Sequence, residues 1–156
     1  SVPEARSEFK GVSRAAVDAS DDSFTTEPGF ETIGARLYRL PVLSPEFCKV
    51  FLSEIAHFEA SDLPKGRPNS MNKDGVLLDE LGFVPGFISP LLDYVRPLAK
   101  ALFPDVGGDS LDVVRPFIVK YTAQDGAGDK RLAAHYDNAE VTLNVCLGQG
   151  FTGGDL

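Results

Sequence analysis

Histidine and cysteine are scarce in this chain of 156 residues, which has two of each. The cysteines, Cys48 and Cys146, fall in a predicted helix and a predicted strand. We expect both to behave as small buried apolar side chains and not as parts of a disulfide framework. Free cysteines of this kind are compatible with a reducing compartment. The histidines are His57 and His135, so a metal site built on imidazole has few candidates.

Long apolar runs are absent as well. No stretch reaches the roughly 18 apolar residues of a membrane-spanning helix. Residues 1–6 lack the basic start and the apolar segment of a secretory signal. We therefore expect a soluble protein with no membrane partner, whose compartment is open, the intracellular side being slightly favoured.

Positive charge is in short supply, with 15 Lys and Arg against 23 Asp and Glu and a formal net charge of -8. Clustered Lys and Arg provide most of the affinity of proteins for nucleic acids and anionic membranes. This balance argues against a nucleic-acid partner.

The length and the 43% hydrophobic content fit one domain with a core of moderate size. Residues 1–32 are mainly acidic and show no sustained apolar period, which predicts a mobile lead-in with solvated charges. The folded domain is expected over residues 33–156.

Two helix starts stand out. Ser44 can cap a helix that has Pro45 at its first position, and Ser89 followed by Pro90 repeats this pattern. Apolar residues then recur at helical spacing: Phe47, Val50, Phe51, Ile55 and Phe58 in the first helix, and Leu91, Leu92, Val95, Leu98 and Leu102 in the second. Pro97 predicts a kink or break near Arg96 in the second helix. His57, on the flank of the first helix, fits a packed or solvated side chain better than a metal ligand.

Strand patterns occupy residues 35–40, 76–78, 113–121 and 141–147. Pro116 favours an edge or bulge position in the third of these. Residues 61–75 are polar and rich in turn formers, which predicts an exposed loop, and a further loop is expected over residues 122–131. Helices followed by strands indicate the α+β class.

The tripeptide His135-Tyr136-Asp137 is the strongest chemical signal in the sequence. Side chains at positions i and i+2 of an extended strand point to the same side, so His135 and Asp137 can offer a nitrogen and an oxygen to one ion. Two histidines and one carboxylate are typical of non-haem iron(II) oxygenases. The alternative for Asp137 is an exposed turn carboxylate, which the following Asn138 favours.

The order of motifs along the chain carries a resemblance. The stretches 64–72 and 75–78, the H-x-D motif at 135–137, the strand 142–145 and the ending Phe151-x-Gly153-Gly154 occur in succession. From about residue 35 to residue 156, the sequence resembles the catalytic domain of the iron(II)- and 2-oxoglutarate-dependent dioxygenases of the prolyl and lysyl hydroxylase type. It is most similar to the 2-oxoglutarate and iron-dependent oxygenase domain-containing proteins.

The resemblance implies a distorted double-stranded β-helix, a jelly roll of two facing sheets, with helices packed on it and the metal at one mouth. It implies that His135 and Asp137 are iron ligands and that Tyr121 reaches 2-oxoglutarate. Thr142, Asn144 and Cys146 share one strand face, which this fold would turn inward, so that Asn144 and Thr142 would serve the cosubstrate. The alternative for Asn144 is a bond to neighbouring backbone in a bend.

The implied reaction is hydroxylation of a C–H bond in a protein or a small molecule, with release of succinate and CO2. Iron(II) and 2-oxoglutarate carry the oxidative chemistry, and ascorbate is the expected reductant. Neither the substrate nor the oligomeric state follows from these motifs.

The pattern departs from the family at its end. The sequence stops 19 residues after Asp137 (156 minus 137), before the family's distal histidine and the basic residue that pairs with 2-oxoglutarate. We expect a fragment of a longer oxygenase that lacks about half the jelly-roll strands and is inactive alone. The alternative is a non-catalytic interaction module derived from such an enzyme.

Overall fold

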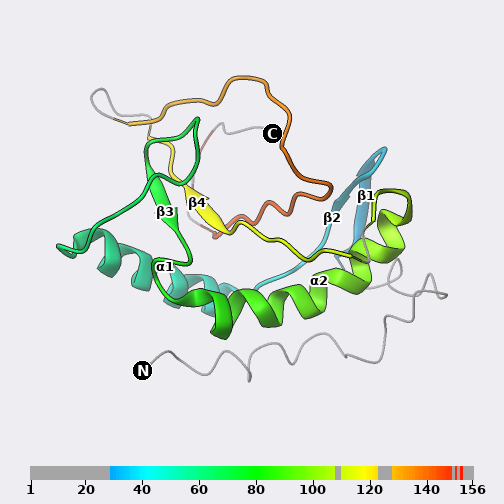
Figure 1. Cartoon of the computed structure of the whole chain (residues 1–156), viewed down its shortest axis with the longest axis horizontal. Helices are drawn as coiled ribbons and strands as arrows, with labels where there is room; N and C mark the ends of the chain where they lie inside the picture. Colours follow the sequence, from blue (N-terminus) through cyan, green and yellow to red (C-terminus); the bar gives the residue numbers. More distant parts are fainter. Residues whose placement is uncertain (1–28, 108–109, 123–127, 149, 151, 153–156) are drawn as a thin grey trace.

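A computed structural model describes residues 29–107, 110–122, 128–148, 150 and 152. Two helices form a base, and a two-stranded sheet, β3 and β4, lies over them (Figure 1). A hairpin, β1 and β2, lies at the far end of the second helix. The described residues therefore belong to the α+β class, as the sequence predicts, but their two small sheets do not confirm the jelly roll that the resemblance implies.

The hairpin consists of β1 (Glu31–Gly34) and β2 (Leu37–Arg39), which pair antiparallel. The strand predicted over residues 35–40 is present as β2 but is shorter, because the chain turns at Arg36, whose φ is +60°. Strand β1 includes Glu31 and Thr32, which precede the predicted start at residue 33. Arg36 bonds Asp105 at 2.6 Å, and this guanidinium lowers the pKa of the Asp105 carboxyl. The hairpin is thereby joined to the end of the second helix.

Helix α1 (Pro45–Ala60) starts as predicted, since the Ser44 Oγ accepts a hydrogen bond from the Phe47 N–H at 3.1 Å. Cys48 is buried, as expected, and burial raises the pKa of its thiol, with a smaller contribution from Cys146. Cys146 itself is exposed, against expectation. His57 is an exposed residue of the last turn.

Helix α2 (Ser89–Leu102) does not start at a serine cap, because a π-helical turn, η4 (Val84–Ile88), leads directly into it. The Ser89 hydroxyl donates to the Val84 carbonyl at 3.1 Å instead of capping. The predicted break near Arg96 is also wrong: the helix continues through Pro97. Leu91 before this proline and Leu98 after it are both buried, and their packing offsets the lost backbone bond. A short 3₁₀ turn, η5 (Pro104–Val106), follows.

The second sheet pairs β3 (Gly75–Leu77) antiparallel with β4 (Phe117–Val119). One further backbone bond on each side, Leu78 N–H to Pro116 C=O and Lys120 N–H to Asp74 C=O, extends the pairing. The strand predicted over residues 113–121 is thus much shorter, because Pro116 has no N–H and stands just before it.

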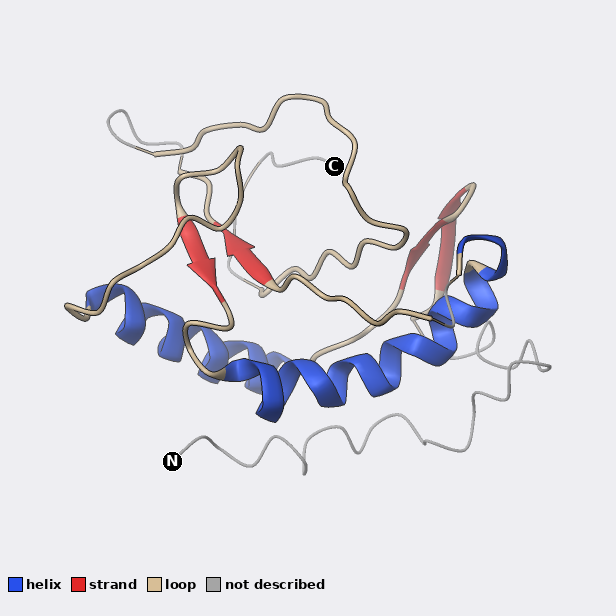
Figure 2. Cartoon of the chain, in the orientation of Figure 1, coloured by secondary structure: helices blue, strands red, loops and turns tan. Residues whose placement is uncertain are grey.

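Residues 141–147 are extended but form no ladder in the part of the chain that the structure describes, so the strand predicted there is not observed (Figure 2). A strand is defined by bonds to a neighbouring strand, which alternation alone does not provide. Residues 1–28, residues 123–127 of the predicted 122–131 loop, Phe151, Gly153 and Gly154 lie outside the described residues.

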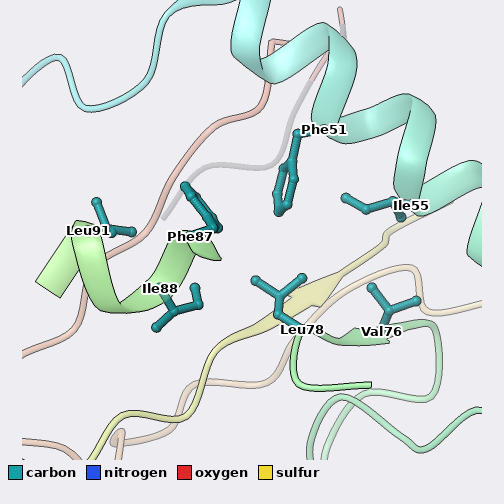
Figure 3. Close-up of a cluster of buried hydrophobic side chains, with 7 residues drawn as sticks. All are labelled: Phe51, Ile55, Val76, Leu78, Phe87, Ile88 and Leu91. Atoms are coloured by element: carbon teal, nitrogen blue, oxygen red, sulfur yellow. The ribbon is translucent and has the colours of Figure 1, made fainter. Parts of the chain in front are cut away.

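The apolar core joins both helices to β3 (Figure 3). Phe51 is its centre, with ring centroids 5.1 Å from those of both Phe83 and Phe87. The buried cluster comprises Phe51, Ile55, Val76, Leu78, Phe87, Ile88 and Leu91. Val50, predicted on the same face as Phe51, is 48% exposed. Among the described helices, none has the length and hydrophobicity to cross a bilayer.

Gly75 should not tolerate a side chain. Its φ is +142°, and a Cβ there would collide with the Ile118 carbonyl of β4, whereas Gly82 has a φ of +70° and open space around it. We expect Gly82→Ala to lower the free energy of unfolding by about 1–2 kcal/mol through backbone strain. Gly75→Ala should add about 1–3 kcal/mol of steric cost. Urea unfolding of both variants tests this, and equal losses would contradict the tight β3–β4 contact.

Candidate functional site

The side chains of His135 and Asp137 meet, as their spacing predicts. His135 Nε2 lies 3.1 Å from Asp137 Oδ1 on an extended segment, while Tyr136 between them points into solvent. The two side chains are 33% and 49% exposed. The segment is extended without being part of a sheet, so the alternation of its side chains is local.

Two contacts fix which atoms face each other. His135 Nδ1 lies 2.9 Å from the Ala133 carbonyl oxygen, which can only accept, so Nδ1 carries a hydrogen. In the neutral ring, Nε2 then presents its lone pair to the Asp137 carboxylate. Two acceptors at 3.1 Å are stable together only with a proton or a cation between them. An imidazole nitrogen and a carboxylate oxygen facing in this way fit iron(II).

Thr142 acts on this pair directly. Its hydroxyl donates to Asp137 Oδ2 at 2.8 Å, so each carboxylate oxygen has its own partner. A hydrogen bond of this kind orients a metal-binding carboxylate. Among the described residues, no group of three or more His, Cys, Asp or Glu side chains could hold a metal. His135 and Asp137 thus supply two donors.

Asn144 is exposed, so the prediction that it is buried is wrong. Leu143 before it is also exposed, but from Asn144 to Leu147 the side chains alternate with the facing opposite to that predicted. Val145 and Leu147 are half-buried, and Leu147 packs against the core, while Thr142, Asn144 and Cys146 lie on the exposed side. Apolar side chains gain more from burial than this asparagine would, which decides the facing.

Tyr121 follows β4, and its ring is 44% exposed. Its hydroxyl oxygen accepts a hydrogen bond from Asn72 Nδ2 at 3.2 Å. Asn72 is 1% exposed and was not singled out by the sequence. Its place in the polar 61–75 stretch suggested an exposed loop, but this part of the loop is fastened to the chain beyond β4.

Asp129 is the fastening group. Its carboxylate accepts from the Lys73 N–H at 2.6 Å and the Asp74 N–H at 3.0 Å, and its own N–H donates to Asp74 Oδ2 at 2.7 Å. The Thr122 N–H also donates to the Asp129 carbonyl, at 2.9 Å. We refer to Asn72, Lys73, Asp74 and Asp129 as the Asp129 clamp. The backbone donors of Asp74 and Lys73 lower the pKa of the Asp129 carboxyl.

A local signal for this loop exists in the sequence. Asn69 Oδ1 accepts from the Met71 N–H at 2.8 Å and the Asn72 N–H at 2.7 Å, which closes a turn. Asparagine followed by such a turn is a recognised pattern. Pro68 beside it is almost fully buried. The turn could therefore be predicted, but not its long-range partner Asp129.

Comparison with known proteins identifies the family. The OGFOD2-like domain family matches residues 6–108, and the chain belongs to this family. That range ends before Tyr121, His135 and Asp137, so the family match rests on the helices and the loop between them.

Several curated proteins are similar to this chain. "2-Oxoglutarate and iron-dependent oxygenase domain-containing protein 2" of Xenopus tropicalis is 57% identical over 122 residues, which cover 78% of this chain and 34% of that protein. The Homo sapiens protein of the same name is 47% identical over 152 residues, covering 96% and 43%.

A more distant similarity joins the chain to collagen-modifying enzymes, as its motifs suggested. Human "Multifunctional procollagen lysine hydroxylase and glycosyltransferase LH3" is 28% identical over 119 residues, covering 71% of this chain and 15% of that protein. The chain thus spans less than half the length of these curated relatives. No solved structure matches it.

The Asp129 clamp should make stability depend on acid. Because the pKa of Asp129 is lower in the folded protein than its ordinary value of 3.8, its stabilisation is complete above that value. It is lost as the pH falls below 3.8 towards the folded pKa. We expect Asp129→Asn to remove part of the decline in thermal midpoint over this range.

The exposed Asp62 provides the control, because Asp62→Asn should leave the acid dependence as it is in the unsubstituted protein. Midpoints recorded between neutral pH and about pH 2.5 would decide the matter. If the thermal midpoints of Asp129→Asn and of the unsubstituted protein fall with pH in parallel, the Asp129 carboxylate does not contribute to the acid dependence of stability.

Proposed function

We propose that this chain carries part of the active site of an iron(II)- and 2-oxoglutarate-dependent dioxygenase, which hydroxylates a C–H bond of a protein or small molecule. The facing of His135 Nε2 and the Asp137 carboxylate across 3.1 Å is the observation that carries it. Membership of the OGFOD2-like family and the names of the relatives support it.

Each residue has a defined task in this proposal. His135 and Asp137 hold the metal, and the Thr142 hydroxyl keeps one carboxylate oxygen oriented so that the other faces the ion. Tyr121 donates its phenolic proton to a carboxylate of 2-oxoglutarate. Bound iron and 2-oxoglutarate supply the activation of dioxygen, with succinate and CO2 as products, and ascorbate keeps the iron ferrous.

The role proposed for Asn144 is narrower. Its exposed amide has no part in holding His135 or Asp137, and it shares the outward side of the segment with Thr142. In the jelly roll that the resemblance implies, this side would face the cosubstrate. Asn144 would then bind 2-oxoglutarate only where further sheet covers it.

Iron sites of this kind use three protein ligands on one face of the metal, and His135 and Asp137 provide two of them. The proposal therefore requires a third ligand from outside the described residues. Residues 1–156 alone should bind iron weakly and show no turnover. The net charge of -8 supports a substrate other than nucleic acid. No partner is required by the geometry beyond the hydroxylated substrate.

Substitution of the two donors tests the proposal in the full-length protein. We expect His135→Ala to abolish iron-dependent succinate release and to weaken Co(II) binding measured by absorption spectroscopy. Thr142→Val, which removes the bond to Asp137, should lower metal affinity by about 10- to 100-fold. His57→Ala is the matched control, because His57 is an exposed residue of α1.

The outcomes separate two classes of function. Succinate release without added metal would contradict the iron assignment. A full-length protein that neither binds Co(II) nor releases succinate would favour the non-catalytic interaction module over the enzyme.

A further inference from the structure

The side chain of Asn72 lies at the junction of three segments. It is 1% exposed and belongs to the loop before β3, while its partners Tyr121 and Asp129 follow β4. Nδ2 lies 3.2 Å from the Tyr121 hydroxyl and 3.4 Å from Asp129 Oδ2, and Oδ1 accepts from Asn69 Nδ2 at 3.1 Å. Both ends of this buried amide are therefore engaged.

The orientation of the amide follows from its neighbours. Asp129 already accepts two backbone N–H groups and, as a carboxylate, has no proton to donate, so the Asn72 atom facing it must be nitrogen. Asn69 leads to the same orientation. Its Oδ1 accepts from two backbone N–H groups, so its amino group is the donor that faces Asn72, and the Asn72 atom on that side must be the oxygen. Two independent constraints thus place an N–H donor against the Tyr121 oxygen.

A phenol has one proton to donate. Since the Tyr121 oxygen accepts from Asn72, its own proton must point elsewhere, and the bond from Asn72 is the one hydrogen bond of this hydroxyl within the described residues. Tyr121 as a residue is 44% exposed, so a ligand can approach this side chain from solvent. A carboxylate is the acceptor that forms the strongest bond with such a group.

We propose that Asn72 is a positioning residue: its buried amide holds the Tyr121 hydroxyl as an acceptor and directs the phenolic proton to a carboxylate of 2-oxoglutarate. This inference rests on the proposed function. Asn72 does not touch the cosubstrate and acts only through Tyr121. The Asp129 clamp supports it, because the bonds to Lys73 and Asp74 fix the backbone between Asn72 and the start of β3.

A double-substitution cycle distinguishes this role from a structural one. The dissociation constant of 2-oxoglutarate is measured by calorimetry on the full-length protein loaded with Mn(II), which binds without turnover. Tyr121→Phe should weaken binding about 10- to 100-fold, the effect of a bond to a charged group. Asn72→Ala should weaken it about 3- to 10-fold in the unsubstituted protein and not at all in the Tyr121→Phe background.

Two further variants guard against a folding defect. Asn72→Leu keeps the size of the side chain but removes the donor to the phenol without adding a charge beside Asp129, so it should weaken 2-oxoglutarate binding as much as Asn72→Ala does. Ser70→Ala lies in the same loop with its side chain exposed and should leave the dissociation constant unchanged. Circular dichroism reports whether each variant is folded.

The possible failures are separate. No binding of 2-oxoglutarate to the unsubstituted Mn(II) protein would overturn the proposed function itself. Binding that Tyr121→Phe leaves unchanged would overturn the inference alone. Equal weakening by Asn72→Ala in both backgrounds would assign Asn72 a purely structural role.

Discussion

The arrangement beside the candidate site depends on one interaction, the acceptance of the Lys73 and Asp74 backbone N–H groups by the Asp129 carboxylate. These amides stand immediately before β3, and Asp129 follows β4, so the bonds tie the outer ends of the two strands together. With the Lys120 to Asp74 bond they continue the β3–β4 pairing beyond its last residues. A two-stranded sheet is marginal by itself, and an ionised group that closes one end compensates for missing neighbours.

The other end of this sheet is held by apolar packing. Val76 and Leu78 enter the cluster formed with Phe51 of α1 and with Phe87 beside α2. Because side chains alternate along a strand, β3 can present Val76 and Leu78 to the helices while its backbone remains paired with β4. Ile118 of β4 also packs against this cluster, so the helices support the strand that leads to Tyr121.

What could be predicted from the sequence is what depends on neighbouring residues. Ser44 caps α1, and His135 meets Asp137, because each contact spans two or three residues. A strand at 141–147 requires a neighbouring strand to pair with, and the alternation of residues does not show whether one is present. Asn144 was predicted to face inward on the assumption of such a sheet, and it is exposed instead. Asn72 was missed because its contacts with Tyr121 and Asp129 span 49 and 57 residues.

The two parts of the candidate site, Tyr121 and the segment with His135 and Asp137, differ in how many bonds and how much burial hold them in place. Tyr121 is bonded to a buried amide, whereas on the exposed segment His135 is bonded to the Ala133 carbonyl and Asp137 to the Thr142 hydroxyl. Fixing the backbone of such a segment costs about 1–2 kcal/mol of conformational entropy per residue, and few bonds act against this cost. Since two acceptors face each other there, a cation between His135 and Asp137 would remove their repulsion and order the segment in one step. In the proposed enzyme, the free energy of metal binding would therefore include the ordering of these three residues.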